Sequence, residues 1–208
     1  MTRMSVEQRR SLLIEAAINV MAREGVANTG TRAIVAEADM AIGVFHYCFR
    51  SKDELVVEVL RSINKRSFAA AEEILAYSTD PREVLQRGLE AYWNHVEDHP
   101  SERMLLFELT HYSLRNDAQK HAAREQYGTY IAGMARFLEA VSTLGDFTWR
   151  SPIDELARYT VATLQGVSIQ WLVMRDGDHA RGMLSHIAAH LLDDAGLERT
   201  GWVPATSG

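Results

Sequence analysis

Residues 31–55 decide the fold, and they read TRAIVAEADMAIGVFHYCFRSKDEL. The first part predicts a helix of about two turns that ends at Asp39, and a second short apolar segment, residues 42–49, follows almost at once. Ser51 then has the position of a helix N-cap with Glu54 three residues later, so a longer helix is expected to begin here. Two short helices joined by a tight turn and followed by a longer helix are typical of a helix-turn-helix module.

The segment before this stretch predicts the helix that completes the module. Ser5 and Gln8 form a capping-box pattern, and Gly25 has the position of a helix stop. Between them apolar residues recur every three or four positions, namely Leu12, Leu13, Ala16, Ala17, Val20 and Met21. The first short helix is expected to be capped by Thr31. A helix-turn-helix places its second short helix in a DNA major groove, although periodicity alone also fits an ordinary helical bundle.

The rest of the chain predicts long helices. Apolar positions with helical spacing fill residues 52–77, 81–98, 101–115, 118–142, 152–175 and 178–194. Pro81 suits a first helical position, and Ser101 and Asp178 are the expected caps of later helices. Residues 199–208 form a tail without periodicity. The pattern predicts an all-α protein of about nine helices, in which residues 1–50 form a three-helix N-terminal domain and residues 51–198 a helical body.

Composition restricts the class of protein. The chain has 208 residues, 47% of them hydrophobic, which is enough to bury a core. No run approaches the roughly 18 apolar residues of a membrane span. The polar N-terminus does not resemble a secretory signal, and a single cysteine fits a reducing compartment, so a cytoplasmic location is expected. The net charge is −6, yet residues 1–66 carry ten basic and eight acidic residues, which can orient that end toward phosphates.

Residues 31–55 resemble the signature of the TetR family of transcriptional repressors. The matching positions include Thr31, Ala38, Gly43, Phe49, Lys52 and Leu55. Asp39 stands where the family usually has glycine in the turn, and Asp tolerates a left-handed backbone better than most residues. Ala41 replaces the common Ser or Pro near the start of the recognition helix and cannot supply a side-chain cap.

The resemblance implies a function for each part of the chain. Residues 1–50 would bind DNA, and residues 51–198 would bind a small molecule and form a homodimer through the last two helices. Such a protein is a ligand-responsive transcriptional regulator, expected to be a repressor. It binds a palindromic operator as a homodimer and is released when the small molecule binds. No cofactor, metal, catalytic residue or membrane contact is expected.

The family pattern also implies which residues contact DNA. They are Thr31, Arg32, Ile42, Gly43, His46, Tyr47 and Lys52. Thr31, Arg32 and Lys52 are expected at phosphates, and Lys52 would act together with the amides of the helix that it begins. Ile42 can touch a thymine methyl group, whereas Val44 and Phe45 are expected to pack inside the module.

Aromatic and neighbouring side chains of the long helices are the candidate ligand-binding residues. They are Trp93, Met104, Phe107, His111, Tyr130 and Trp171. Helical bundles hold ligands in apolar cavities with a few polar groups, but a stripe of Met and aromatic residues is also the ordinary pattern of a core. The last two helices have apolar faces wide enough for a two-fold dimer contact, and a charge at Leu184 or Leu191 is expected to break the dimer or unfold the chain.

Two other classes of protein stay open. The first is a metal-dependent hydrolase, because His95 and His99, and likewise His186 and His190, lie one helical turn apart. A third ligand is not identifiable, and no glutamate follows His95 directly, as the zinc-hydrolase motif requires. The second is an interaction module that kept this fold and lost operator binding. Cys48 fits either a redox switch or a small packing residue.

Overall fold

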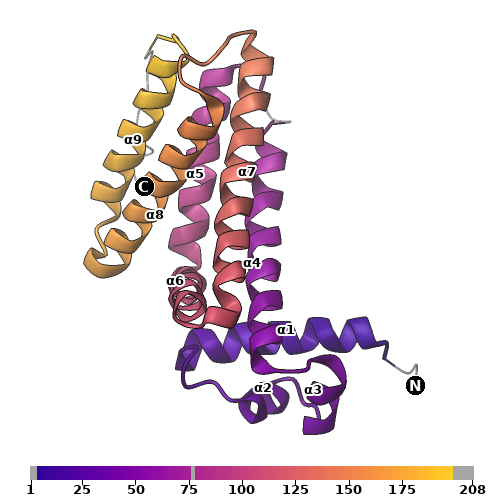
Figure 1. The fold of residues 1–208 in the computed structure, drawn as a ribbon. Coiled ribbons are helices and arrows are strands. Elements are labelled where there is room, and N and C mark those ends of the chain that lie inside the picture. The colour runs from indigo at the N-terminus through magenta and orange to yellow at the C-terminus, as the bar shows by residue number, and fades with distance from the viewer. Residues whose placement is uncertain (1–3, 76–77, 199–208) are drawn as a thin grey trace. The chain divides into compact units, whose positions relative to one another are not determined.

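The computed structural model describes residues 4–75 and 78–198 (Figure 1). Every regular element in these ranges is helical, which confirms the all-α class. The α-helices are α1 (Val6–Glu24), α2 (Thr31–Glu37), α3 (Ile42–Cys48), α4 (Lys52–Leu75), α5 (Pro81–Asp98), α6 (Pro100–Arg115), α7 (Lys120–Gly145), α8 (Ile153–Met174) and α9 (Gly177–Asp194), with a short 3-10 helix at Asp117–Gln119. None of the described helices is both long and apolar enough to span a bilayer. The predicted tail, residues 199–208, lies outside the described residues.

Several helix ends follow the capping residues that the sequence predicts. Ser5 and Gln8 form a complete capping box at the start of α1, and Gly25 ends that helix with a positive φ of 82°. Pro81 is the first residue of α5, and the Asp80 side chain accepts a hydrogen bond from the Arg82 amide. These ends depend on local chemistry alone, so the sequence is sufficient to place them.

Three predicted caps are wrong by one or two residues. Helix α2 begins at Thr31, and the extended residue before it, Gly30, is the N-cap. Helix α6 begins at Pro100 rather than after Ser101, because the fixed φ of proline suits a first helical position. Helix α9 is capped by Asp176, whose side chain accepts from the His179 amide at 2.9 Å, so Asp178 lies inside the helix.

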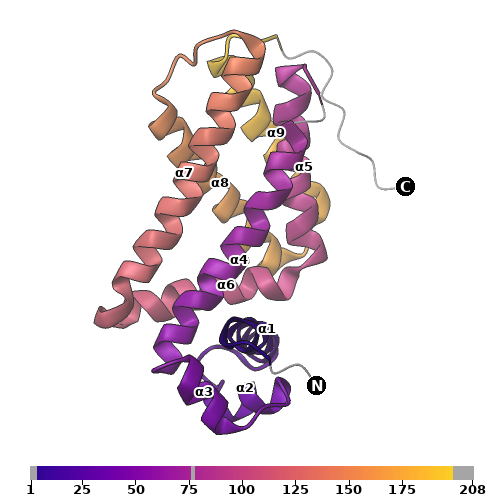
Figure 2. The same ribbon diagram turned by 90° about the vertical axis from the view of Figure 1, so that its right-hand side faces the viewer.

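The chain forms two compact units that are not consecutive in sequence. The first unit comprises Met1–Lys65 and Pro100–Gln126, so α6 joins the three N-terminal helices. Within this unit α6 packs against α1, on the side of α1 opposite α2 and α3 (Figures 1 and 2). Leu13 and Ala17 of α1 and Leu105 and Leu109 of α6 belong to the same buried core. Compactness therefore does not divide the chain at residue 50, and the functional division predicted there stays a prediction.

The second unit comprises Arg66–His99 and Tyr127–Gly208. In it α9 packs against both α5 and α8. The Asp194 carboxylate at the end of α9 accepts from the amide of Ser151 at 3.1 Å and from its hydroxyl at 2.5 Å. Trp149 is buried in the same connection and donates its indole N–H to the carbonyl of Leu138 at 3.1 Å. These contacts anchor the connection between α7 and α8.

Candidate nucleic-acid interface

Helix α3 has one buried face and one exposed face. Phe45, Cys48 and the following Phe49 are each at most 5% exposed and pack into the core of the first unit. The other face carries Ile42, Gly43, His46 and Tyr47, which are all exposed. Tyr47 has 67% of its surface in solvent, although burial of such a large aromatic side chain is strongly favourable. This face is therefore available to a partner, and it holds four of the seven predicted DNA contacts.

Gly43 lies in an open part of that face. A methyl group added at its Cα would meet no atom within 4 Å. Its backbone is ordinary helix, so neither packing nor conformation within the described structure requires glycine here. A glycine that the fold does not need allows a partner to approach the backbone closely.

The turn before α3 confirms the interpretation of Asp39. This residue has a φ of 50°, in the left-handed region that the sequence predicts for it. The next amide, that of Met40, donates to the carbonyl of Val35 at 2.8 Å and closes the turn. Ala41, as expected, makes no side-chain capping bond to α3.

Thr31 and Arg32 lie at the start of α2, where the amides of the first turn have no partners inside the helix. Thr31 is half-buried and Arg32 is exposed. A helix N-terminus with an exposed arginine beside it suits a phosphate group. The predicted phosphate contacts at this end stay a prediction.

The ammonium group of Lys52 has a partner within the first unit. Its Nζ atom donates to the carbonyl of Val26, in the loop between α1 and α2, at 2.6 Å, and lies 5.8 Å from the centroid of the Tyr112 ring. Burial lowers the pKa of Lys52, although the negative charge of the neighbouring Asp53 acts to raise it. To bind a phosphate as predicted, the ammonium group would have to leave the carbonyl or share its protons with it.

Glu108 of α6 binds the other side of the same loop residue. Its Oε2 atom accepts a hydrogen bond from the amide of Val26 at 2.9 Å. On the same face of α6, the Tyr112 hydroxyl donates to Asp53 of α4 at 3.0 Å. From the sequence, Glu108 is a polar residue beside an apolar stripe, of the kind that can orient a ligand, and its bond to the α1–α2 loop is not predicted. These contacts link α6 to both the α1–α2 loop and the start of α4.

The six predicted ligand-binding residues fall into two sets. Met104, Phe107 and His111 share one face of α6 in the first unit, and the Arg103 guanidinium lies 5.0 Å from the Phe107 ring centroid. The other set, Trp93, Tyr130 and Trp171, lies in the second unit.

The second set includes a pair of tryptophans in direct contact. The rings of Trp93 and Trp171 meet edge to face with centroids 5.5 Å apart, whereas Tyr130 contacts the ring of Tyr127. Trp93 is only 1% exposed, and its indole N–H has no hydrogen-bond partner among the described residues. Buried donors are nearly always paired, so this N–H is available to an acceptor that enters from outside the chain.

The histidine pairs take part in contacts between rings. The rings of His95 and His99 stack with centroids 4.6 Å apart, and the His190 ring lies 4.6 Å from that of Tyr159. Within the described residues no group of three or more His, Cys, Asp or Glu side chains could hold a metal ion. Cys48 is buried in the core of the first unit, which is the position of a packing residue.

Comparisons with known proteins agree with this geometry. Residues 13–59, which contain α2, α3 and the start of α4, match the family model described as bacterial regulatory proteins, tetR family. The HTH-type nicotine-responsive transcriptional repressor HdnoR of Paenarthrobacter nicotinovorans is 25% identical over 195 residues, which cover 94% of this chain and 100% of the relative.

Solved structures show the same likeness. The multidrug binding protein EbrR, in complex with imidazole, is 29% identical with a TM-score of 0.62, covering 86% of this chain and 94% of EbrR. A TetR transcription regulator from Haloarcula marismortui has a TM-score of 0.75 over 90% of this chain and 97% of its own, at 16% identity, which shows the shared fold. The chain therefore belongs to the TetR family of bacterial regulatory proteins and is a helix-turn-helix transcriptional regulator.

Proposed function

We propose that this regulator represses transcription by binding a palindromic operator as a homodimer, and that a small molecule bound by its helical body releases it. The observation that carries the proposal is the exposed face of α3, where Tyr47 and His46 stand beside the open Gly43. Side chains of this kind on a short helix can read base edges in a major groove. The relative HdnoR, which matches nearly the whole chain, is itself a transcriptional repressor.

The DNA contacts divide into two kinds. Ile42, His46 and Tyr47 are assigned to the bases, with the Gly43 backbone close to the duplex. Thr31 and Arg32 are assigned to phosphates at the N-terminus of α2, and Lys52 joins them if it exchanges the Val26 carbonyl for a phosphate. Phosphate contacts give affinity for any duplex, whereas base contacts give preference for the operator.

Two substitutions separate these kinds of contact. Arg32→Ala is expected to weaken binding to operator and random duplex by similar factors, because one phosphate contact is lost. For the same reason the salt slope, which is the slope of log affinity against log salt concentration, is expected to fall in magnitude by about one. Tyr47→Ala is expected to lower the preference for the operator by about tenfold, since a base contact is worth about 1–3 kcal/mol. Titrations of both variants against the DNA flanking the gene and against random duplex measure the two effects. Unchanged binding by both would contradict the assignment of α3 and α2.

We assign the contact between the two copies of the homodimer to an apolar surface on α8. Its exposed residues recur with helical spacing, and we call them the α8 stripe: Tyr159, Ala162, Gly166, Ile169 and Val173. Val173 is 73% exposed. Gly166 on α8 and Gly182 on α9 both have open space where a side chain would stand, so another helix can approach closely. An exposed apolar stripe with small residues suits the same surface of a second copy related by a two-fold axis.

Helix α6 is assigned to transmit ligand binding to the DNA-binding helices, because its two faces make different contacts. One face carries the candidate ligand contacts Met104, Phe107 and His111. The other holds the α1–α2 loop through Glu108 and the start of α4 through Tyr112. A ligand that favours a shifted or tilted position of these helices would change how α3 is presented to DNA.

The indole N–H of Trp93, which is unpaired among the described residues, indicates the chemical class of the effector. This buried N–H needs an acceptor, and the aromatic ring of Trp171 lies next to that of Trp93, with centroids 5.5 Å apart. HdnoR is named as nicotine-responsive, and the EbrR structure holds imidazole, so both relatives are associated with nitrogen heterocycles. We therefore assign a flat nitrogen heterocycle with an acceptor atom as the effector class.

Ligand and operator should weaken each other's binding by the same factor. If the effector lowers operator affinity a hundredfold, its preference for the released state is about 2.7 kcal/mol, and operator DNA must lower effector affinity a hundredfold too. Mass spectrometry of the denatured protein would identify a co-purified ligand, and calorimetric titration with and without operator would give both affinities. Equal ligand affinities in the two titrations would show that the ligand does not control DNA binding.

A further inference from the structure

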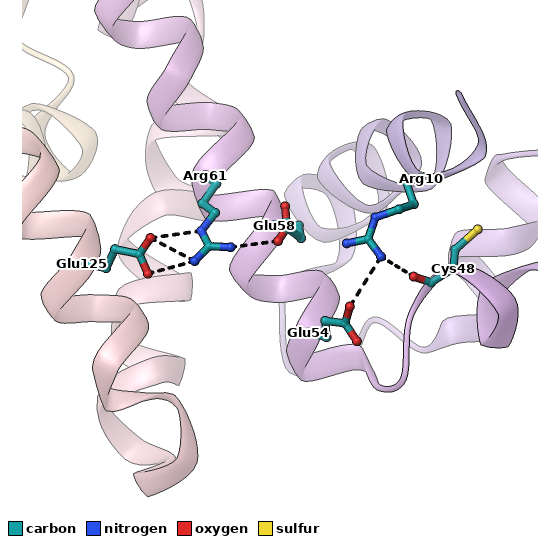
Figure 3. A network of polar contacts seen from close by, with 6 residues as sticks. All are labelled: Arg10, Cys48, Glu54, Glu58, Arg61 and Glu125. Carbon is teal, nitrogen blue, oxygen red and sulfur yellow. Dashed lines mark hydrogen bonds and ion pairs between the residues drawn. The ribbon is translucent and has the colours of Figure 1, made fainter. Parts of the chain in front are cut away.

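The C-terminal end of α3 is held by a side chain from α1. Arg10 donates through Nη1 to the carbonyl of Cys48, the last residue of α3, and the same atom lies 3.4 Å from Oε1 of Glu54 on α4. The guanidinium group also lies 4.3 Å from the centroid of the Phe49 ring. Figure 3 shows the Arg10 side chain pointing toward both Cys48 and Glu54. Three helices of the first unit thus meet at one guanidinium group.

Glu54 makes the complementary contact. Its Oε2 atom accepts from the amide of Arg50 at 2.9 Å, and its own amide donates to Ser51 Oγ at 3.1 Å. The predicted cap at Ser51 is confirmed, but the Glu54 carboxylate binds the Arg50 amide rather than that of Ser51. The Arg50 amide lowers the pKa of Glu54 most, burial opposes this, and Arg10 lowers it further. We call Arg10, Glu54, the Cys48 carbonyl and the Arg50 amide the Arg10 network.

Helix α3 needs such contacts because its own short backbone and its apolar packing do not fix its rotation and axial position. It has seven residues and no side-chain cap at its start. A helix this short is marginal in water, and the last carbonyls of a helix lack partners within it and favour a cation. The buried Phe45 and Cys48 determine which face points inward, but apolar contacts are not directional. Hydrogen bonds with defined geometry add the restraint on rotation and axial position.

We propose that Arg10 is a positioning residue for operator recognition. Together with Glu54 it sets the rotation and axial position of α3, and hence the placement of His46 and Tyr47, without itself touching DNA. The guanidinium is suited to this because Nη1 carries two N–H groups, which serve the Cys48 carbonyl and Glu54 at once, while the planar group lies over the Phe49 ring. A lysine ammonium is a point charge on a flexible stem and has no such plane. The proposal rests on the proposed role of α3 as the helix that reads the operator.

The first test is Arg10→Lys, which keeps the charge and removes the planar guanidinium group that lies over the Phe49 ring. Affinity for the DNA flanking the gene is expected to fall about tenfold, because a charged hydrogen bond that orients α3 is lost. Affinity for random duplex and the salt slope are expected to stay unchanged, because the number of positive charges is unchanged. Operator affinity equal to that of the wild type would overturn the proposal.

The second test is Glu54→Gln, for which electrostatics alone predicts the opposite sign. Removing a negative charge near the DNA-binding face should strengthen binding to any duplex. The Arg10 network instead predicts weaker operator binding, because the ion pair that fixes α3 is lost. The double variant Arg10→Lys with Glu54→Gln is expected to lose little more than either single variant, since both act on the same contact. Losses that simply add, or tighter operator binding by Glu54→Gln, would overturn the proposal.

Arg61 provides a matched control on α4, in the same unit. Its guanidinium makes two hydrogen bonds of 3.1 Å to Glu125 of α7 and one of 3.0 Å to Glu58, away from α3 (Figure 3). Arg61→Lys also removes a guanidinium group that joins two helices, here α4 and α7, and is expected to lower Tm while leaving operator affinity unchanged. An equal loss of operator affinity would attribute the effect to loosening of α4 and overturn the proposal.

The same titrations separate failure of this proposal from failure of the proposed function. Equal wild-type affinities for flanking and random DNA would overturn the proposed function and this proposal with it. A wild type that prefers the flanking DNA, with an Arg10→Lys variant that binds it equally well, would overturn the role of Arg10 alone.

Discussion

Gly43→Ala should leave the fold intact, or slightly more stable, and lower operator affinity by about ten- to a hundredfold. In a helix the substitution stabilises by about 0.5–1 kcal/mol, and in this structure the added methyl group meets no atom of the chain. On DNA, the same methyl group would occupy the space needed for close approach of the α3 backbone. Overpacking of a tight contact costs about 1–3 kcal/mol, which corresponds to the expected loss. Thermal unfolding and operator titration measure the two effects.

Gly128→Ala is the matched control for this prediction. Gly128 lies in α7, and a methyl group added there also meets nothing within 4 Å. This variant should gain helix stability and keep wild-type operator affinity. A Gly43→Ala variant that bound the operator as tightly as the wild type would show that the α3 backbone does not approach DNA closely at this residue.

The sequence already predicted which residues of α3 face inward and which face outward, and the Gly43→Ala test depends on that division. The spacing of Phe45 and Cys48 predicts a buried face, and the residues between them then face outward. The left-handed backbone of Asp39 was expected from the resemblance, because the family usually has glycine at this position and Asp tolerates that conformation better than most residues. These features depend on a few neighbouring residues, so helical spacing and the family resemblance together were sufficient to predict them.

The contacts that hold α3 and the α1–α2 loop could not be predicted in this way. Lys52, Glu108 and Arg10 all bind backbone groups that lie far from them in sequence. A backbone amide or carbonyl is present at every position, so its partner leaves no pattern in the residue types. The family position of Lys52 identified it as a candidate contact, and Glu108 stood out only as a polar residue beside an apolar stripe that could orient a ligand. Nothing in the sequence selected Arg10.

The sequence also could not predict that α6 packs with the N-terminal helices in the first unit. Its apolar residues predict that one face is buried but not which helix covers it. The same limit affects the proposed dimer surface. Leu184 and Leu191 are 4% and 1% exposed, because they pack inside their own chain. Of the two predicted effects of a charge there, this burial favours unfolding, so a test of the dimer has to use the α8 stripe.

Ile169→Glu should convert the dimer to a monomer and lower operator affinity by at least about a hundredfold. Ile169 is 40% exposed in the chain, in the middle of the α8 stripe, so a carboxylate there does not disturb the chain's own core. In a two-fold dimer it would bury one unpaired charge from each copy, and a buried charge without a partner costs about 3–5 kcal/mol. Size measurement at micromolar concentration reports the oligomeric state.

The loss of operator affinity follows from the geometry of the palindrome. A two-fold dimer is expected to present its α3 helices roughly 34–36 Å apart, one turn of the duplex. Binding of the second half-site is then intramolecular and adds a factor of about 10²–10⁴, which a monomer forfeits. Affinity for an isolated half-site should therefore stay unchanged in Ile169→Glu.

Leu144→Glu is the control, because Leu144 is 37% exposed, lies at the end of α7 outside the stripe, and gains the same charge. It should remain dimeric and bind the full operator like the wild type. An Ile169→Glu variant that stayed dimeric would place the contact between copies elsewhere. The loss of affinity expected here comes from the second half-site rather than from any change in α3. A monomeric variant with full operator affinity would therefore show that one copy is sufficient to bind the operator.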